Sequence, residues 1–139
     1  MKNIFFFFLL IFSISVFGQE SKQKPVKITQ KNCLAKKGYS FRLKEVTSDS
    51  RCPEGVQCIW AGEVQTIISV YKDKKLVEET KLTVSPNNNE EAINFFAKYY
   101  TKKKIESIYV FPFPIKDTVL DKKEYHLEIN FTGITNLKK

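Results

Sequence analysis

The chain has 139 residues, which is enough for one hydrophobic core but not for two. Its 23 lysines and arginines outnumber its 15 aspartates and glutamates, giving a net charge of +8, and the lysines are spread along the whole sequence. A dispersed positive charge favours solubility and protects strand edges, whereas nucleic-acid binding needs basic residues interleaved with exposed aromatics on one face. We therefore expect one domain and no nucleic-acid partner.

The first eighteen residues have the three parts of a secretory signal peptide. Lys2 is the basic start, Ile4 to Phe17 form the apolar stretch, and Gly18 ends the small-residue exit. The apolar stretch has fourteen residues and contains two serines, whereas a transmembrane helix needs about 20 apolar residues. We predict cleavage after Gly18, export to the periplasm or the medium, and no stable membrane insertion.

The remaining chain is predicted to be a flexible leader over 19–30 and a single β-rich domain over 31–139. The leader is polar and rich in lysine, so it has too little apolar surface to order itself. Beyond it, apolar and polar residues alternate as in strands with one buried face. These segments are 39–44, 63–71, 76–84, 105–111 and 125–131, with four charged residues at 72–75 forming a hairpin turn.

Residues 85–100 are harder to assign. The proline and asparagines of 85–89 indicate a loop. After it we expect a short helix at 90–97, with Asn89 as its cap and Ile93 and Phe96 on its apolar face. An aromatic-rich strand over 95–100 is the alternative.

The pattern as a whole predicts the fold class. Five or six strands with short polar connections, and no helix long enough to join parallel neighbours, favour antiparallel pairing. We therefore predict an all-β, mainly antiparallel domain, either a small β-sandwich or an open barrel, with one short helix. We expect it to be a monomer.

Two cysteines, a proline, two glycines and the only tryptophan lie within fourteen residues, 49–62. Cys52 and Cys58 should form a disulfide in an exported protein, and the sequence from Cys52 to Gly55 fits a type I turn. We expect Trp60 to be a buried anchor packed over this disulfide, and Gly62 to allow a close backbone approach. The structural motif is then Asp49, Arg51, Pro53, Gly55, Trp60 and Gly62. Cys33, the odd cysteine, is expected to be buried and unpaired.

The same residues argue against several kinds of site. Three cysteines and one histidine without close spacing do not supply the ligands of a zinc site, and five residues between Cys52 and Cys58 do not resemble a redox pair. His126 has no recognisable nucleophile or orienting acid. We expect no metal and no cofactor. Carboxylates near the cysteine loop, at Asp49, Glu54 and Glu63, remain as candidate catalytic acids.

The stretch Asp-Ser-Arg-Cys-Pro-x-x-x-x-Cys-x-Trp-Ala-Gly, at Asp49 to Gly62, resembles a family of small exported proteins and lipoproteins of Gram-negative bacteria, frequent in the Bacteroidetes. The resemblance extends more weakly to Val110–Pro114 and to the strand that contains Tyr125. It implies a small β-rich envelope or secreted protein with no assigned reaction, ligand or partner. Many relatives carry a lipid-attachment cysteine, which this chain lacks, so the resemblance does not imply a membrane anchor here.

These observations predict a non-catalytic binding domain, not an enzyme. Its partner is expected to be another protein or an anionic envelope polymer. Protease inhibition is one form, because a rigid loop loses little entropy on binding. The alternative is a small secreted hydrolase that uses the carboxylates near the cysteine loop. The candidate binding loop is Pro53, Glu54, Gly55, Val56 and Gln57.

Overall fold

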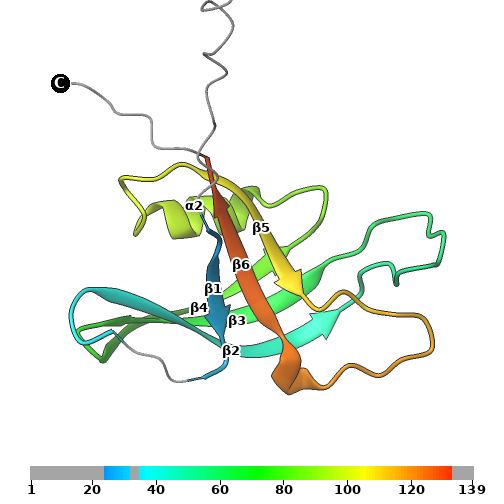
Figure 1. The fold of residues 1–139 in the computed structure, drawn as a ribbon, viewed down its shortest axis with the longest axis horizontal. Coiled ribbons are helices and arrows are strands. Elements are labelled where there is room, and N and C mark those ends of the chain that lie inside the picture. The colour runs from blue at the N-terminus through cyan, green and yellow to red at the C-terminus, as the bar shows by residue number, and fades with distance from the viewer. Residues whose placement is uncertain (1–23, 32–34, 133–139) are drawn as a thin grey trace, which may run out of the picture.

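The structure is a computed structural model that describes residues 24–31 and 35–132. The predicted signal peptide and Cys33 lie outside the described residues. Within them, two three-stranded antiparallel sheets form most of the molecule, and the strands of one run across those of the other (Figure 1). One sheet has the order β1-β6-β5 and the other β2-β3-β4. The predicted all-β, mainly antiparallel fold is therefore confirmed.

The elements follow one another in the order β1, β2, β3, β4, α2, β5, η1 and β6. Their bounds are β1 Val26–Thr29, β2 Tyr39–Asp49, β3 Val64–Lys72, β4 Lys75–Val84, α2 Glu90–Ala97, β5 Ile105–Phe111, the 3₁₀ turn η1 Lys122–Glu124 and β6 His126–Phe131. None of the helices in the described part of the chain has the length and apolar character needed to cross a bilayer.

The alternation in the sequence produces the core. In β3, the four predicted inward residues Val64, Thr66, Ile68 and Val70 are all fully buried. In β6, Leu127, Ile129 and Phe131 are buried, as is Tyr125 just before the strand. Both sheets therefore contribute alternate side chains to one shared core, as period-two patterns do when one face is covered.

The predicted flexible leader covers residues 19–30, of which 19–23 lie outside the described residues, and the strand β1 contradicts its remaining part. Val26–Thr29 pairs antiparallel with β6, from Val26 beside Ile129 to Thr29 beside His126. Ile28 points into the core and is almost completely buried. The prediction was wrong because backbone pairing with a neighbouring strand stabilises a short segment whose own apolar surface is small.

The predicted helix is present with the predicted bounds, but the hydrogen bonds at its N-terminus differ. The Asn89 side chain does not cap α2; its Oδ1 accepts from Ser85 N at 3.0 Å and its Nδ2 donates to Ile108 O at 2.7 Å. The Asn88 side chain instead accepts a hydrogen bond from Glu90 N at 3.1 Å. Asn89 is the N-cap residue, as predicted, and its backbone carbonyl accepts a hydrogen bond from Ile93 N at 2.8 Å, but its side chain joins the loop to β5 instead of capping the helix.

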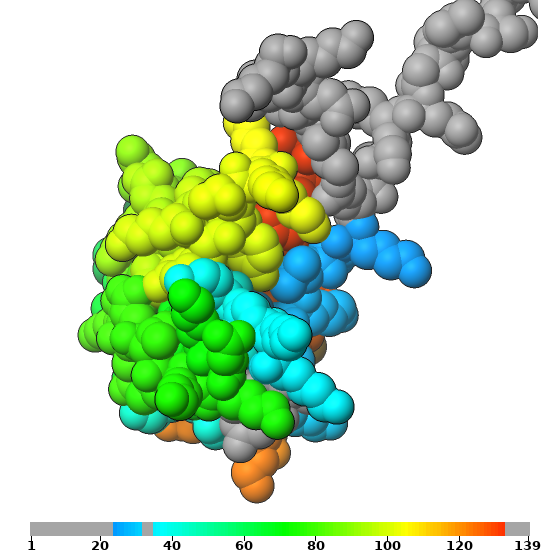
Figure 2. All heavy atoms as spheres, turned by 90° about the vertical axis from the view of Figure 1, so that its left-hand side faces the viewer, coloured from blue at the N-terminus to red at the C-terminus, as the bar shows by residue number. Residues whose placement is uncertain are grey.

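An aromatic cluster joins α2 to the sheets. Figure 2 shows the face on which the yellow-green part of the chain that contains α2 lies against the cyan and green strands. The Phe41 ring lies 5.3 Å from those of Phe96 and Tyr99, and 5.5 Å from that of Tyr100, measured between centroids. The Tyr99 hydroxyl donates to Glu78, and burial together with this hydrogen bond raises the pKa of Tyr99 to about 12. The packed rings of this cluster therefore hold α2 against the sheets.

The two sheets do not close into a barrel along the side where β1 and β2 meet. Strand β1 has 4 residues and β2 has 11. Next to the end of β1, Arg42 Nε of β2 donates to Gln30 O at 3.1 Å. The second half of β2 is therefore paired with β3 on one edge and has no strand hydrogen-bonded to its other edge among the described residues.

Candidate functional site

Two loops project together from one end of the molecule (Figure 1). We call residues 50–63, between β2 and β3, the disulfide loop, and residues 112–121, between β5 and η1, the proline loop. They are joined directly, because Glu54 N donates to Pro114 O at 2.8 Å and Glu54 forms a parallel bridge with Ile115. The two loops therefore present one continuous surface.

The base of the disulfide loop continues the β2–β3 hairpin. Ser50 N donates to Glu63 O at 2.8 Å and Cys52 N donates to Ala61 O at 3.0 Å. Gly62 has φ +70°, and a Cβ there would lie 2.0 Å from the Ser50 carbonyl oxygen. The predicted close backbone approach at Gly62 is confirmed, and any side chain at this position would separate the two arms of the loop.

The predicted disulfide closes the tip of this loop, with the Cα atoms of Cys52 and Cys58 5.9 Å apart. The turn inside it is displaced from the prediction by one residue. Val56 N donates to Pro53 O at 3.2 Å, so Gly55 stands third in the turn, with φ +80°. A positive φ at the third position suits a type II turn and not the expected type I turn, which explains the need for glycine.

The Arg51 side chain connects the base of the disulfide loop to the proline loop. It is only 5% exposed and forms an ion pair of 2.6 Å with Asp49. The guanidinium also donates to Val110 O, and to Pro112 O at 2.8 Å, and it lies 4.7 Å from the centre of the Phe113 ring. These contacts satisfy a buried cation with a carboxylate, two carbonyls and an aromatic face.

Asp49 is held by donors from two directions. Its Oδ1 accepts from Arg51 N at 3.1 Å and Nε at 2.9 Å, and its Oδ2 also accepts from the Tyr125 hydroxyl at 3.0 Å. Burial alone would raise the pKa of Asp49, but the hydrogen bonds from Arg51 outweigh it and hold the pKa below its ordinary value. Burial, followed by the charge of Asp49, raises the pKa of Tyr125, so its hydroxyl remains a donor.

Trp60 contradicts the prediction of a buried anchor. Its side chain is 77% exposed and that of Ile59 is 107% exposed, while Val56 is also exposed. The reason is that the loop extends past the sheets, and Arg51 with Phe113 occupies the space between the loop base and the core. In the neighbouring proline loop, Ile115 and Val119 are exposed as well, the latter at 97%.

The candidate catalytic carboxylates are not brought to one site. Asp49 borders a groove beside Tyr125, whereas Glu63 borders a different hollow with Glu90 and Glu91. Glu54 lies exposed at the disulfide loop and borders neither. Asp49, Glu54 and Glu63 therefore do not line a common cavity, whereas glycoside hydrolysis uses two carboxylates at one site.

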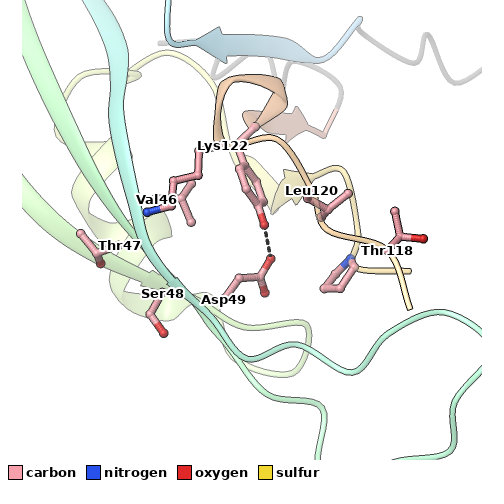
Figure 3. Close-up of a pocket in the computed structure, with 9 residues that line it drawn as sticks. Val46, Thr47, Ser48, Asp49, Thr118, Leu120 and Lys122 are labelled. Carbon is pink, nitrogen blue, oxygen red and sulfur yellow. Dashed lines mark hydrogen bonds between the residues drawn. The ribbon is translucent and has the colours of Figure 1, made fainter. Parts of the chain in front are cut away.

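A groove of about 270 Å³ opens beside the Asp49–Tyr125 hydrogen bond (Figure 3). Figure 3 shows Val46 to Asp49 along one side, with Thr118 and Leu120 on the other and Lys122 at one end. The full lining is Val46, Thr47, Ser48, Asp49, Pro114, Thr118, Leu120, Lys122 and Tyr125. The groove therefore lies between β2 and the proline loop.

All five residues of the predicted candidate binding loop, 53–57, lie in the disulfide loop. Pro53 is half-buried and the other four are exposed. Sequence reasoning missed Ile59, Ile115 and Val119 as surface residues. The available signal was that Ile59 and Trp60 are consecutive and apolar directly after Cys58, which fits neither strand alternation nor a helix.

Comparison of the chain with protein-family models, curated proteins and solved structures found no match in any of the three. The family resemblance of the Asp49–Gly62 motif therefore stays a prediction. The site has to be interpreted from its own geometry.

Proposed function

We propose that this protein is an exported, non-catalytic binding domain that recognises another protein through the disulfide loop and the proline loop. The observation that carries the proposal is the exposure of Ile59 and Trp60 on a loop tied by a disulfide and by backbone hydrogen bonds. Tryptophan is enriched among residues that dominate binding energy at protein interfaces. A loop fixed in advance loses little conformational entropy on association.

A protein partner fits this surface better than an anionic polymer does. Residues 52–63 contain two glutamates and no lysine or arginine, and the one cation at the loop base, Arg51, is buried and paired. Both loops instead carry exposed apolar side chains, namely Val56, Ile59, Trp60, Ile115 and Val119. Apolar groups gathered on one surface are typical of protein interaction sites.

Protease inhibition is a specific form of this proposal. The segment Pro53–Gln57 is exposed or half-buried and held between the two cysteines, so it can be presented to an active-site cleft as a preformed loop. The flanking Ile59 and Trp60 would then add apolar contact beside the cleft.

Site-specific photocrosslinking in the exporting cells tests the proposal. A photoreactive residue at Ile59 should give a covalent adduct with a second protein. The same residue at Val77, which is also exposed and apolar but lies on β4, is the matched control and should give none. Equal adducts at both positions, or none at Ile59, would contradict the proposal.

A loop replacement tests the inhibitor form separately. Exchanging Pro53–Gln57 for glycine and serine while keeping both cysteines should abolish inhibition of the protease found by screening extracellular proteases with the wild-type protein. Undiminished inhibition by the replaced loop, or no inhibition of any protease by the wild type, would exclude inhibition and leave general protein binding to be tested by crosslinking.

A further inference from the structure

The groove beside Asp49 runs along the open edge of β2. Four consecutive residues, Val46 to Asp49, line it. Side chains of consecutive residues in a regular strand point to opposite faces, yet Ser48 and Asp49, which occupy consecutive register positions beyond the bulge at Thr47, both line the groove. A cavity lined by all four follows the edge of the strand. The opposite edge of β2 is already paired with β3.

Val46 to Ser48 lack the charged side chains that guard the preceding part of this edge, although the segment contains a β-bulge, which also discourages pairing. Native edges are commonly guarded by charged side chains, as Lys44 and Glu45 guard the preceding part of β2. The groove segment instead carries Val46, Thr47 and Ser48. Thr47 has no register partner on β3, because the ladder passes from Val46–Thr66 to Ser48–Gln65. The extra residue of such a bulge stays outside the ladder.

The groove also carries one positive charge that is not neutralised within the described residues. Its two charged groups are Asp49 and Lys122. Asp49 is balanced by the buried guanidinium of Arg51, whereas none of the ion pairs in the described part of the chain includes Lys122. Val46 and Tyr125 supply a buried apolar floor, and Thr47, Ser48 and Thr118 add hydroxyls at the rim.

We propose that this groove binds an extended segment of the partner protein, which pairs with the edge of β2 at Val46–Asp49 and places an acidic side chain at Lys122. Strand addition of this kind supplies affinity from main-chain hydrogen bonds and selectivity from neighbouring side-chain pockets. The groove volume of about 270 Å³ is near the lower end of the roughly 300 to 1,000 Å³ of typical small-molecule pockets, so it would hold only a short part of the segment; the β2 edge along its wall is what favours a peptide. This inference rests on the proposed function, since it assigns a second contact to the same partner.

Selection of peptides from a displayed library of random linear sequences tests the inference without knowledge of the partner. The bait is the full mature protein with its disulfide intact. Enriched peptides should contain Asp or Glu, and a synthetic copy should shift the backbone amide signals of residues 46–49 in the ¹⁵N-labelled protein. An absence of enrichment, peptides without acidic residues, or shifts confined to the disulfide loop would each overturn the inference.

A pair of neighbouring lysines gives the matched control. Lys122 and Lys123 belong to the same exposed turn η1, but only Lys122 borders the groove. Lys122→Glu should weaken the synthetic peptide about 10-fold, because it removes an attraction and adds a repulsion. Lys123→Glu should leave the affinity within about 2-fold, since its charge is exposed and outside the groove. Equal effects of the two variants would contradict a role for Lys122.

The two proposals can fail independently. The crosslinking experiment at Ile59 tests only the proposed loop surface. Peptide binding by the Lys122→Glu protein tests only the proposed groove. If Lys122→Glu unfolds, Lys122→Gln tests the same charge with a smaller perturbation and should still weaken the acidic peptide. Unchanged peptide affinity in a folded Lys122→Gln variant would contradict the proposed ion pair between Lys122 and the acidic side chain of the partner.

Discussion

The two halves of the Asp49–Gly62 segment behave in opposite ways. In the first half, the charged side chains of buried Arg51 and half-buried Asp49 are satisfied by hydrogen bonds to the rest of the molecule. The second half, represented by Ile59 and Trp60, is apolar and exposed to solvent. The charged side chains therefore attach the loop to the rest of the molecule, and the apolar side chains face solvent. This is the reverse of the usual distribution, in which apolar side chains are buried and charged ones are exposed.

This contrast separates stability from recognition along a single short segment. Substitutions of Asp49 or Arg51 should reduce the free energy of unfolding, whereas substitutions of the exposed Ile59 or Trp60 should leave it nearly unchanged and affect only binding. Each prediction below tests one side of this division.

The largest effect is expected for Arg51→Ala. Removing the guanidinium leaves Asp49 without its ion pair and two backbone carbonyls without a donor. Breaking a buried pair in this way typically costs about 3 to 5 kcal/mol. Urea denaturation monitored by circular dichroism measures the loss. Arg42→Ala is the control, because Arg42 makes one hydrogen bond to Gln30, and it should cost clearly less. Equal losses would show that Arg51 is no more than an ordinary surface contact.

Removal of the disulfide is expected to have the next largest effect. The chain-entropy model assigns about 2 kcal/mol to a closed loop of this size, and the Cys52→Ser/Cys58→Ser double variant should lose about that amount. The hydrogen bonds at the loop base and the Arg51 contacts remain, so the variant should still fold. A midpoint of denaturation identical to that of the wild type would contradict this estimate.

The ion pair should also make stability depend on pH. Since the folded state holds the pKa of Asp49 below its ordinary value of 3.8, the carboxylate contributes stability that is fully present above that value. The contribution is lost as the pH falls through the folded pKa. The stability difference between wild type and Asp49→Asn should therefore narrow on acidification below about pH 4. A difference that stays constant from pH 7 to pH 2 would exclude this role.

The smallest effect on stability is expected for Trp60→Ala. A residue that is 77% exposed leaves no cavity when truncated, so the free energy of unfolding should change by no more than about 0.5 kcal/mol. Tyr100→Ala, in the aromatic cluster, is the contrasting truncation of a packed ring. If Trp60→Ala lowered the free energy of unfolding by several kcal/mol, Trp60 would have to be buried in the folded protein, as the sequence predicted.

The strands and the helix could be predicted because their signals are local. The alternation in β3 and β6, and the apolar face of α2, depend on covering one side of each element, which the sequence records directly. The disulfide and the close approach at Gly62 were also predictable, since they depend on spacing and on the absence of a side chain.

The arrangement of the site could not be predicted in the same way. Arg51 is satisfied by carbonyls of residues 110 and 112, which are about sixty positions away and carry no sequence signal. Trp60 was misjudged because tryptophan is usually largely buried, whereas its exposure here follows from how far the loop extends past the sheets. The groove lies between β2 and the proline loop, which are brought together only in the assembled fold.

The most direct test of this division uses Trp60, which is the only tryptophan in the chain and therefore the only source of its tryptophan fluorescence. Emission and acrylamide quenching would be compared between native and urea-denatured protein at low concentration. If the second half of the segment is displayed, the native emission maximum should nearly coincide with that of the denatured protein, and quenching should be similarly efficient. A native spectrum shifted strongly to shorter wavelength and protected from acrylamide would contradict the account.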